Sequence, residues 1–347
     1  MNNIIKKVNG INITVDFRTE LLGILMLISD YHEKYPHLFV DFDNNRFYVN
    51  KIKNQFDKYK DDEVVKEFAK LVDEHSFNYD APFDLFLQLD SNFNTNQLDD
   101  YTFKDRLQSD SRIYNFISKL SDFAKKINFE DFYNNNSELY KSWINNMSGA
   151  FKKYNISDFF RKYYGYLNEK EFVINIIAFT TNGAYCCDLN DKIVSCFPVF
   201  AEMIKEKLFD SQNKEKYILQ NPIHEFSHGY VNPITDKYNI LNEETNLFDD
   251  IRENMKKQAY PYDSHIINEH IIRGIGARFI YLVHQDNNWY KNRIQREKDL
   301  GFKYLDNIID SLIYYENNRD TYKTLDNFYP IIIENLKKYK KETANQK

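Results

Sequence analysis

His224-Glu225-Phe226-Ser227-His228 is the stretch from which the rest of this sequence is best interpreted. If the stretch is helical, its two histidines stand one turn apart on the same face, so both imidazoles can reach one tetrahedral ion. Glu225 lies about 100° around such a helix from His224, which suits a base better than a third ligand. The spacing predicts a zinc site with His224 and His228 as ligands and Glu225 as the general base. The alternative is a surface helix that carries two unrelated histidines.

The composition is that of a folded globular chain. Its 347 residues allow one large domain or two of ordinary size, and 42% of them are apolar, which is ample for a core. The net charge of −6 provides no basic surface, so DNA or RNA binding is not expected. The longest apolar run, residues 21–28, is too short to span a bilayer, so no membrane span is expected.

The cysteines and the N-terminus bear on the cellular compartment. Cys186, Cys187 and Cys196 match neither a disulfide framework nor a zinc-ligand spacing, and their odd number suits a reducing compartment. No signal peptide begins at Met1, so a cytoplasmic location is expected. A chain whose leader had already been removed would read the same.

The spacing of apolar residues differs between two parts of the sequence. From residue 17 to about residue 150, apolar residues recur at helical spacing, notably over residues 21–28, 64–71 and 113–120, which predicts a mainly helical N-terminal half. After Glu171 the pattern changes to short runs rich in Val, Ile and Phe, at residues 172–179, 184–187 and 192–197, which predict three strands.

The strand region precedes the histidine-containing helix. Asn182-Gly183 is typical of a tight hairpin turn, so the simplest arrangement is a three-stranded antiparallel meander. An exposed edge of this sheet could accept an extended peptide as an extra strand, or the sheet could simply close the core. We therefore expect an α+β fold, predominantly α, with a helical region over residues 1–168. Residues 169–347 would then form a catalytic region in which a small antiparallel sheet lies next to the metal helix.

Prolines lie at both ends of the predicted metal helix. Pro222 suits the first helical position with Asn221 as the N-cap, and it also suits a kink in a helix that began earlier. Gly229 and Asn232-Pro233 predict that the helix ends there.

A catalytic zinc site needs a third protein ligand, and Glu269 is the residue that we select. It lies in a predicted helix that Asp263 or Ser264 would cap, and it is the one carboxylate on a mostly apolar face. A buried carboxylate requires a partner, and a metal ion supplies one. The alternative is a salt bridge between Glu269 and Arg273, one turn further on.

Other polar residues near Glu269 compete for roles in the same site. Two of them are rival ligands, namely His265 and His270. Four could donate a hydrogen bond to a developing oxyanion, namely Tyr260, Tyr262, His265 and Arg273. Two could orient the imidazoles, namely Asn268 and Asp236. The sequence does not choose within these sets.

The two motifs resemble a known group of enzymes. His224-Glu225-Phe226-Ser227-His228, followed by Asn268-Glu269-His270 on a second helix, resembles the gluzincin branch of zinc metallopeptidases, in which the third ligand is glutamate. The same residues are similar to an uncharacterised bacterial family of predicted metallopeptidases. In that family the metal helix tends to read His-Glu-Phe-Ser-His and to end near Asn-Pro, and residues 15–22 of this chain are similar to its N-terminal stretch. The segment between His228 and Glu269 is longer than in thermolysin-like enzymes.

This resemblance implies a zincin-like catalytic region that binds Zn²⁺ through His224, His228 and Glu269. It also implies a metallopeptidase that hydrolyses peptide or protein substrates, with Glu225 as the general base. One alternative is a metallohydrolase that acts on non-peptide amides or esters. Another is a non-catalytic binding protein on a peptidase-like scaffold, and the presence of Glu225 argues against it.

Overall fold

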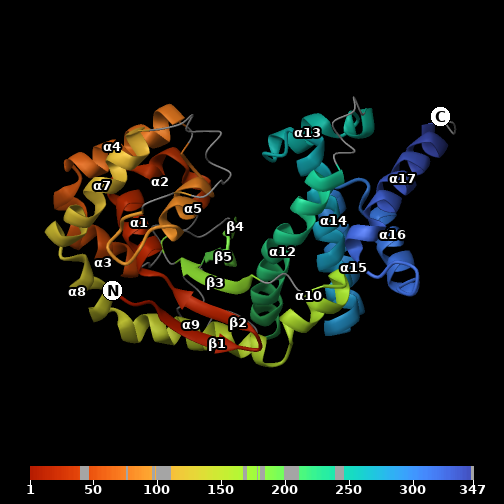
Figure 1. Ribbon diagram of the computed structural model, residues 1–347, viewed down its shortest axis with the longest axis horizontal. Helices are drawn as coiled ribbons and strands as arrows, with labels where there is room; N and C mark the ends of the chain where they lie inside the picture. Colours follow the sequence, from red (N-terminus) through yellow and green to blue (C-terminus); the bar gives the residue numbers. More distant parts are fainter. Residues whose placement is uncertain are drawn as a thin grey trace. The chain divides into compact units, whose positions relative to one another are not determined.

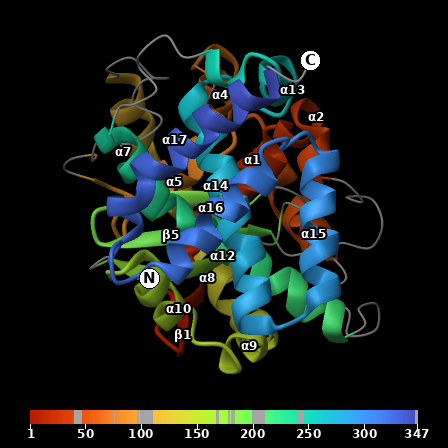
Figure 2. The same ribbon diagram turned by 90° about the vertical axis from the view of Figure 1, so that its right-hand side faces the viewer.

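The computed structural model describes residues 1–39, 47–75, 77–95, 98, 111–166, 170–177, 179, 184–198, 211–238 and 246–344. The chain divides into two compact units. The first comprises Met1–Lys153 and Lys170–Glu225, and the second comprises Tyr154–Glu169 and Phe226–Lys347. Helices predominate in both, and the first contains a small sheet, so the fold is α+β and predominantly α, as the sequence predicts (Figures 1 and 2).

The sheet has five strands rather than the predicted three. In chain order they are β1 (Ile4–Val8), β2 (Ile11–Val15), β3 (Glu171–Ile177), β4 (Tyr185–Asp188) and β5 (Lys192–Pro198). Their order across the sheet is β1-β2-β3-β5-β4. The pairs β1–β2 and β4–β5 are antiparallel, whereas β2–β3 and β3–β5 are parallel. The sheet is therefore mixed.

The predicted antiparallel meander is wrong because β5 inserts between β3 and β4. Burial explains this order: six of the seven residues of β5 are buried, and β3 is buried along most of its length. Such strands suit the interior of a sheet. Only one of the four residues of β4 is buried, which suits an edge strand. The turn predicted at Asn182-Gly183 lies outside the described residues.

The hairpin of β1 and β2 was not expected from the sequence. Its turn is Asn9-Gly10, and both residues have positive φ, 46° at Asn9 and 83° at Gly10. Asparagine and glycine adopt this conformation at low cost, which makes the pair a strong hairpin signal. The dipeptide could therefore have revealed these two strands.

Helices pack against the sheet in the first unit, and α1 and α5 are almost wholly buried, with all seven residues of α5 buried. Every residue of α1 except Arg18 is buried. The apolar positions predicted at helical spacing lie on the buried faces of α1, α4 and α7. The helices are α1 (Phe17–Ile28), α2 (Tyr31–Lys34), α3 (Phe47–Phe56), α4 (Glu63–His75), α5 (Ala81–Leu87), α7 (Ser111–Lys126), α8 (Phe129–Asn135) and α9 (Ser137–Lys152), with short 3₁₀ turns at Pro36–Phe39 and Asp57–Tyr59.

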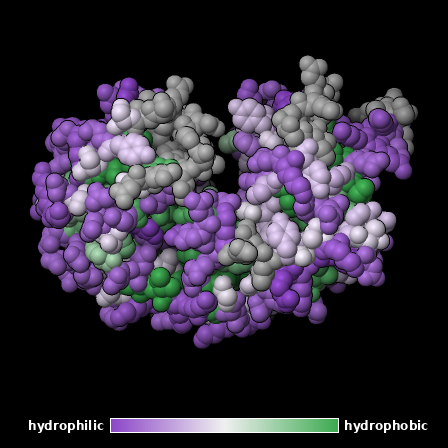
Figure 3. All heavy atoms as spheres, in the orientation of Figure 1, coloured by the Kyte–Doolittle hydropathy of each residue, from purple (hydrophilic) through white to green (hydrophobic). Residues whose placement is uncertain are grey.

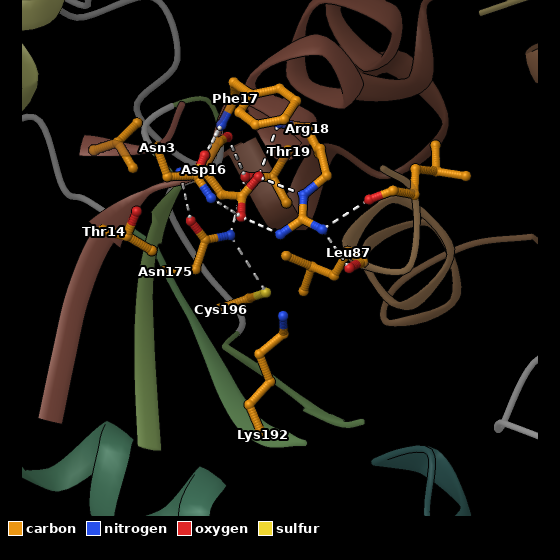
Figure 4. Close-up of polar contacts among 12 residues, drawn as sticks. Asn3, Thr14, Asp16, Phe17, Arg18, Thr19, Leu87, Asn175, Lys192 and Cys196 are labelled. Carbon is orange, nitrogen blue, oxygen red and sulfur yellow. Dashed lines mark hydrogen bonds and ion pairs between the residues drawn. The ribbon is translucent and has the colours of Figure 1, made fainter. Parts of the chain in front are cut away.

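A buried polar network fixes the junction of β2 and α1 (Figure 4). Asp16 caps α1 by accepting from the backbone N–H of Arg18, and its carboxylate also binds the Arg18 guanidinium, with Nε 2.8 Å from Oδ1. The guanidinium donates onward to the carbonyl oxygens of Leu87 and Leu89. Asn175 of β3 accepts from the backbone N–H of Asp16 at 3.0 Å. Through these hydrogen bonds, residues 15–22 connect β3, the start of α1 and the carbonyl groups of Leu87 and Leu89.

Glu20 is a buried carboxyl whose protonation should make stability depend on pH. It is 1% exposed, and its Oε2 accepts hydrogen bonds from Tyr48 and, at 3.0 Å, from Tyr140, whereas Oε1 is buried without a hydrogen-bond partner. Burial raises the pKa of Glu20 from 4.5 to about 7, against the effect of the two tyrosine hydroxyls. At pH values between 4.5 and about 7, Glu20 therefore keeps a proton in the folded protein that it has lost in the unfolded chain.

Stability contributed by protonated Glu20 is therefore present below pH 4.5 and is lost as pH rises toward 7. The loss is about 3 kcal/mol, because a pKa raised from 4.5 to about 7 changes the free energy of unfolding by about 1.4 kcal/mol for each pH unit between the two values. Glu20→Gln, which is neutral at every pH, should remove this dependence. Urea unfolding at pH 5 and pH 8 should show the variant gaining about 2.5 kcal/mol over the parent between the two values, slightly less than the full loss because pH 5 already lies above 4.5. A difference that stays constant with pH would contradict the assignment.

The second unit is built from long helices. In it α14 packs against α16, and a Cβ at Gly274 would lie 3.0 Å from Leu312, so glycine permits the close approach. Its elements are α10 (Ile156–Tyr164), the later part of α12 (Ser211–Tyr238), a 3₁₀ turn (Asn246–Phe248), α13 (Arg252–Lys257), α14 (Asp263–Phe279), a π-helical turn (Ile280–His284), α15 (Asn287–Asp299), α16 (Leu305–Asn317) and α17 (Leu325–Ala344).

The surface in Figure 3 is largely hydrophilic, with small apolar patches. Among the helices of the described residues, none combines the length and the hydropathy that crossing a bilayer would require.

Candidate metal centre

The two histidines of the motif lie on one continuous helix, α12, which runs from Ser211 to Tyr238. Pro222 is therefore an interior residue of a helix that began earlier, rather than its first residue. The predicted stop at Gly229 and Asn232-Pro233 is wrong, because the helix continues past it. A buried apolar face explains the continuation, since packing can offset the hydrogen bonds that proline removes. That face comprises Ile223, Phe226, Tyr230, Val231 and Ile234.

Glu269 lies in the middle of α14, which runs from Asp263 to Phe279. Nearly every residue from Ile266 onward is buried, and Glu269 itself is 4% exposed. The N-cap is Tyr262, which makes no side-chain cap, so the predicted cap at Asp263 or Ser264 is wrong by one position or more. Asp263 instead pairs with Arg252 of α13.

The ligand atoms of His224, His228 and Glu269 all lie within 4.8 Å of one another. Nε2 of His228 is 3.4 Å from Oε1 of Glu269. Two atoms bound at about 2.1 Å to one tetrahedral ion are separated by roughly this distance. The structure thus brings together three residues that are separated by up to 45 positions in the sequence.

A second group of possible metal-ligating residues, Asp30, His32 and Glu33, differs in kind. Its members are neighbours in the sequence, and both acidic residues are exposed. Chain proximity alone brings them together, so the group carries no argument for a site.

The other carboxylate oxygen of Glu269 contacts an arginine. Oε2 lies 3.1 Å from Nη2 of Arg273, so the ion pair considered as the alternative role for Glu269 is present together with the contact to His228. Arg273 also binds Glu297 at 2.6 Å, and Glu297, which is 1% exposed, binds Arg293 at 2.8 Å. The four charges alternate in sign. Burial disfavours the charged form of Arg273, but Glu269 and Glu297 outweigh it and raise its pKa.

The rival histidines are not members of this group. His270 is fully buried against the rings of Phe248 and Phe302, and its Nδ1 lies 2.7 Å from the carbonyl oxygen of Ile266. Burial lowers its pKa to about 4, so the ring is neutral. His265 is exposed, with its ring against Tyr262.

Glu225 follows His224 on α12 and is 7% exposed. Burial raises the pKa of the Cys186 thiol on β4, and the negative charge of Glu225 raises it further. Cys186 is half-buried, and no sequence pattern connects it with the motif.

Of the residues considered as hydrogen-bond donors to an oxyanion, Arg273 contacts the ligand Glu269 directly. The hydroxyl of Tyr260 lies 3.4 Å from Nη2 of Arg273, whereas Tyr262 is 65% exposed. Asn268 joins a hydrogen-bonded chain that reaches His228, whereas Asp236 is exposed.

Four residues to which the sequence analysis assigned no role at the site support the ligands. They are Asn232, Thr235, Arg293 and Glu297. Asn232 could have been found, because it lies four residues after His228 on a helix, but it was interpreted as part of a helix stop. The pairing of Arg273 with Glu297 joins α14 to α15 and has no local signal.

The fold and this cluster define a predominantly helical α+β protein with a possible His-His-Glu metal centre. Residues 11–335 match the family described as a domain of unknown function, DUF4932, and the chain belongs to that family. The match covers both helices of the centre. No curated protein and no solved structure matches the chain.

Proposed function

We propose that this protein is a zinc-dependent metallopeptidase. The observation that carries the proposal is the convergence of His224, His228 and Glu269, whose ligand atoms lie within 4.8 Å of one another, beside Glu225 on the same helix as the histidines. Two imidazole nitrogens and one carboxylate oxygen form a donor set that zinc prefers, and three protein ligands leave a fourth position for water or substrate. The resemblance of the two motifs to gluzincins supports the same assignment.

The residues present fit a zinc ion on two further counts. Glu269 is buried, and its Oε1, the oxygen that does not contact Arg273, faces Nε2 of His228, as the oxygen of a shared ligand set would. The separation of 3.4 Å between the two ligand atoms suits a shared tetrahedral ion. When bound, zinc would activate a water molecule and polarise a carbonyl.

Glu225 has the role of proton carrier in this proposal. Because Glu225 lies about 100° around α12 from His224, its carboxylate is better placed to accept a proton from the attacking water than to bind the ion. The same carboxyl then passes the proton to the leaving amine, which completes hydrolysis of the amide bond.

Strand β4 supports a peptide as the substrate. Within the described residues it is the last strand at its side of the sheet, and the charge of Glu225 adds to the raised pKa of the Cys186 thiol on this strand. An extended peptide that pairs with such an edge contributes main-chain hydrogen bonds that do not depend on its side chains.

Zinc content tests the ligand assignment. The purified protein and Glu225→Gln should each hold about one zinc per chain after equilibration with the metal, whereas His224→Ala and His228→Ala should retain much less. His265→Ala is the control, because this exposed histidine lies outside the cluster, and it should match the parent. Full retention by both ligand variants would overturn the proposal.

A further inference from the structure

A chain of hydrogen bonds leads away from His228 on the side opposite the proposed ion. Nδ1 of His228 lies 3.2 Å from Oδ1 of Asn232, one turn further along α12. The same Oδ1 accepts from Nδ2 of Asn268 at 2.9 Å. Oδ1 of Asn268 in turn accepts from the hydroxyl of Thr235. Two residues of α12 and one of α14 thus form a hydrogen-bonded chain that ends at the His228 ring.

The directions of these bonds determine which nitrogen of His228 carries its proton. The Thr235 hydroxyl donates to Asn268, so the amide oxygen of Asn268 faces Thr235 and its NH₂ group faces Asn232. Asn232 must then present its oxygen. That oxygen can only accept, so Nδ1 of His228 donates to it as N–H. In the neutral ring Nε2 then keeps its lone pair, and Nε2 is the atom that faces Oε1 of Glu269, with the proposed ion between them.

Burial makes this arrangement rigid. Thr235 is 5% exposed and Asn268 is 6% exposed, so neither can readily exchange its partner for water. If the Asn232 amide were reversed, its NH₂ group would face the NH₂ group of Asn268. Two donors that face each other in a buried network are costly. The chain therefore favours one tautomer of His228 before any metal arrives.

We infer that Asn232 is a positioning residue, held by Asn268 and Thr235, which fixes His228 as the Nδ1–H tautomer with Nε2 open to the metal. The inference rests on the proposed function where it concerns zinc. The tautomer itself does not, and it can be measured without metal.

The first measurement is zinc affinity, by competition with a chelator of known affinity. Asn232→Ala should bind zinc about 10- to 100-fold more weakly than the parent, the usual effect of losing such a partner. Asn232→Asp, which can accept from both donors, should bind at least as tightly as the parent. Asn335→Ala is the matched control, because Asn335 is also half-buried in the second unit and its amide also donates to a side chain, at 3.2 Å to Ser311. It should leave the affinity unchanged.

The second measurement is the ¹⁵N chemical shifts of the His228 ring in metal-free protein, near pH 8.5, where an ordinary histidine is neutral. The parent should show Nδ1 protonated, and Asn232→Ala should show a mixture of tautomers. A parent with Nε2 protonated, or equal zinc affinity in Asn232→Ala and Asn335→Ala, would overturn the inference. Absence of zinc binding by the parent would refute the proposed function alone, because the ring shifts would still decide the tautomer.

Discussion

Replacing Glu225 with glutamine is expected to lower zinc-dependent peptide hydrolysis by about 10²- to 10⁴-fold, the range that general acid–base catalysis contributes. The amide fills the same space on α12, where Glu225 is 7% exposed, but it cannot accept the proton of an attacking water. Because Glu225 is not one of the clustered ligands, the variant should still hold about one zinc per chain. Initial rates on a broad peptide library, with zinc-loaded parent and variant, give the comparison.

Glu334→Gln is the matched control for this experiment, since it makes the same chemical change at an exposed position of α17. Its rate should equal that of the parent. If Glu225→Gln keeps the parent's rate, the base is another group. If the zinc-loaded parent hydrolyses small amides or esters but no peptide, the substrate class is wrong, and if it hydrolyses neither, a binding role replaces catalysis.

The sequence predicted the helical elements well because their signals are local. The apolar spacing in α1, α4 and α7 requires only residues within a few turns of each other, and all three helices form where the spacing indicates. The same applies to the two helices that carry His224, His228 and Glu269. Their convergence, by contrast, depends on how α12 and α14 pack. The sequence supported it through the one carboxylate on an apolar helix face and through the resemblance to gluzincins.

The strand order could not be predicted from the same kind of signal. Whether β3 pairs with β4 or with β5 depends on which strand is buried on both faces, and that is decided by helices far away in the sequence. The end of α12 was misjudged for a related reason. Asn232-Pro233 is a local stop signal, but the buried face that includes Tyr230 and Ile234 outweighs it.

Replacing Arg273 with alanine should lower the free energy of unfolding of the metal-free protein by about 3–5 kcal/mol, as expected when one partner of a buried ion pair is removed. Arg273 lies between two carboxylates that water cannot readily reach, Glu269 at 4% exposed and Glu297 at 1% exposed. Without it, Glu297 keeps Arg293, whereas Glu269 loses its closest positive charge. Chemical denaturation in the presence of a chelator measures the loss.

Two further variants separate charge from packing in this loss. Arg252→Ala removes a more exposed guanidinium, paired with Asp249 and Asp263, and should cost less than about 1 kcal/mol. Glu269→Gln added to Arg273→Ala should restore part of the stability, because it removes the carboxylate that has lost its partner. An Arg273→Ala variant as stable as Arg252→Ala would contradict the alternating chain of charges. If the double variant recovers nothing, the loss comes from the contact of the guanidinium with the Phe302 ring, which it covers at 4.1 Å, rather than from charge.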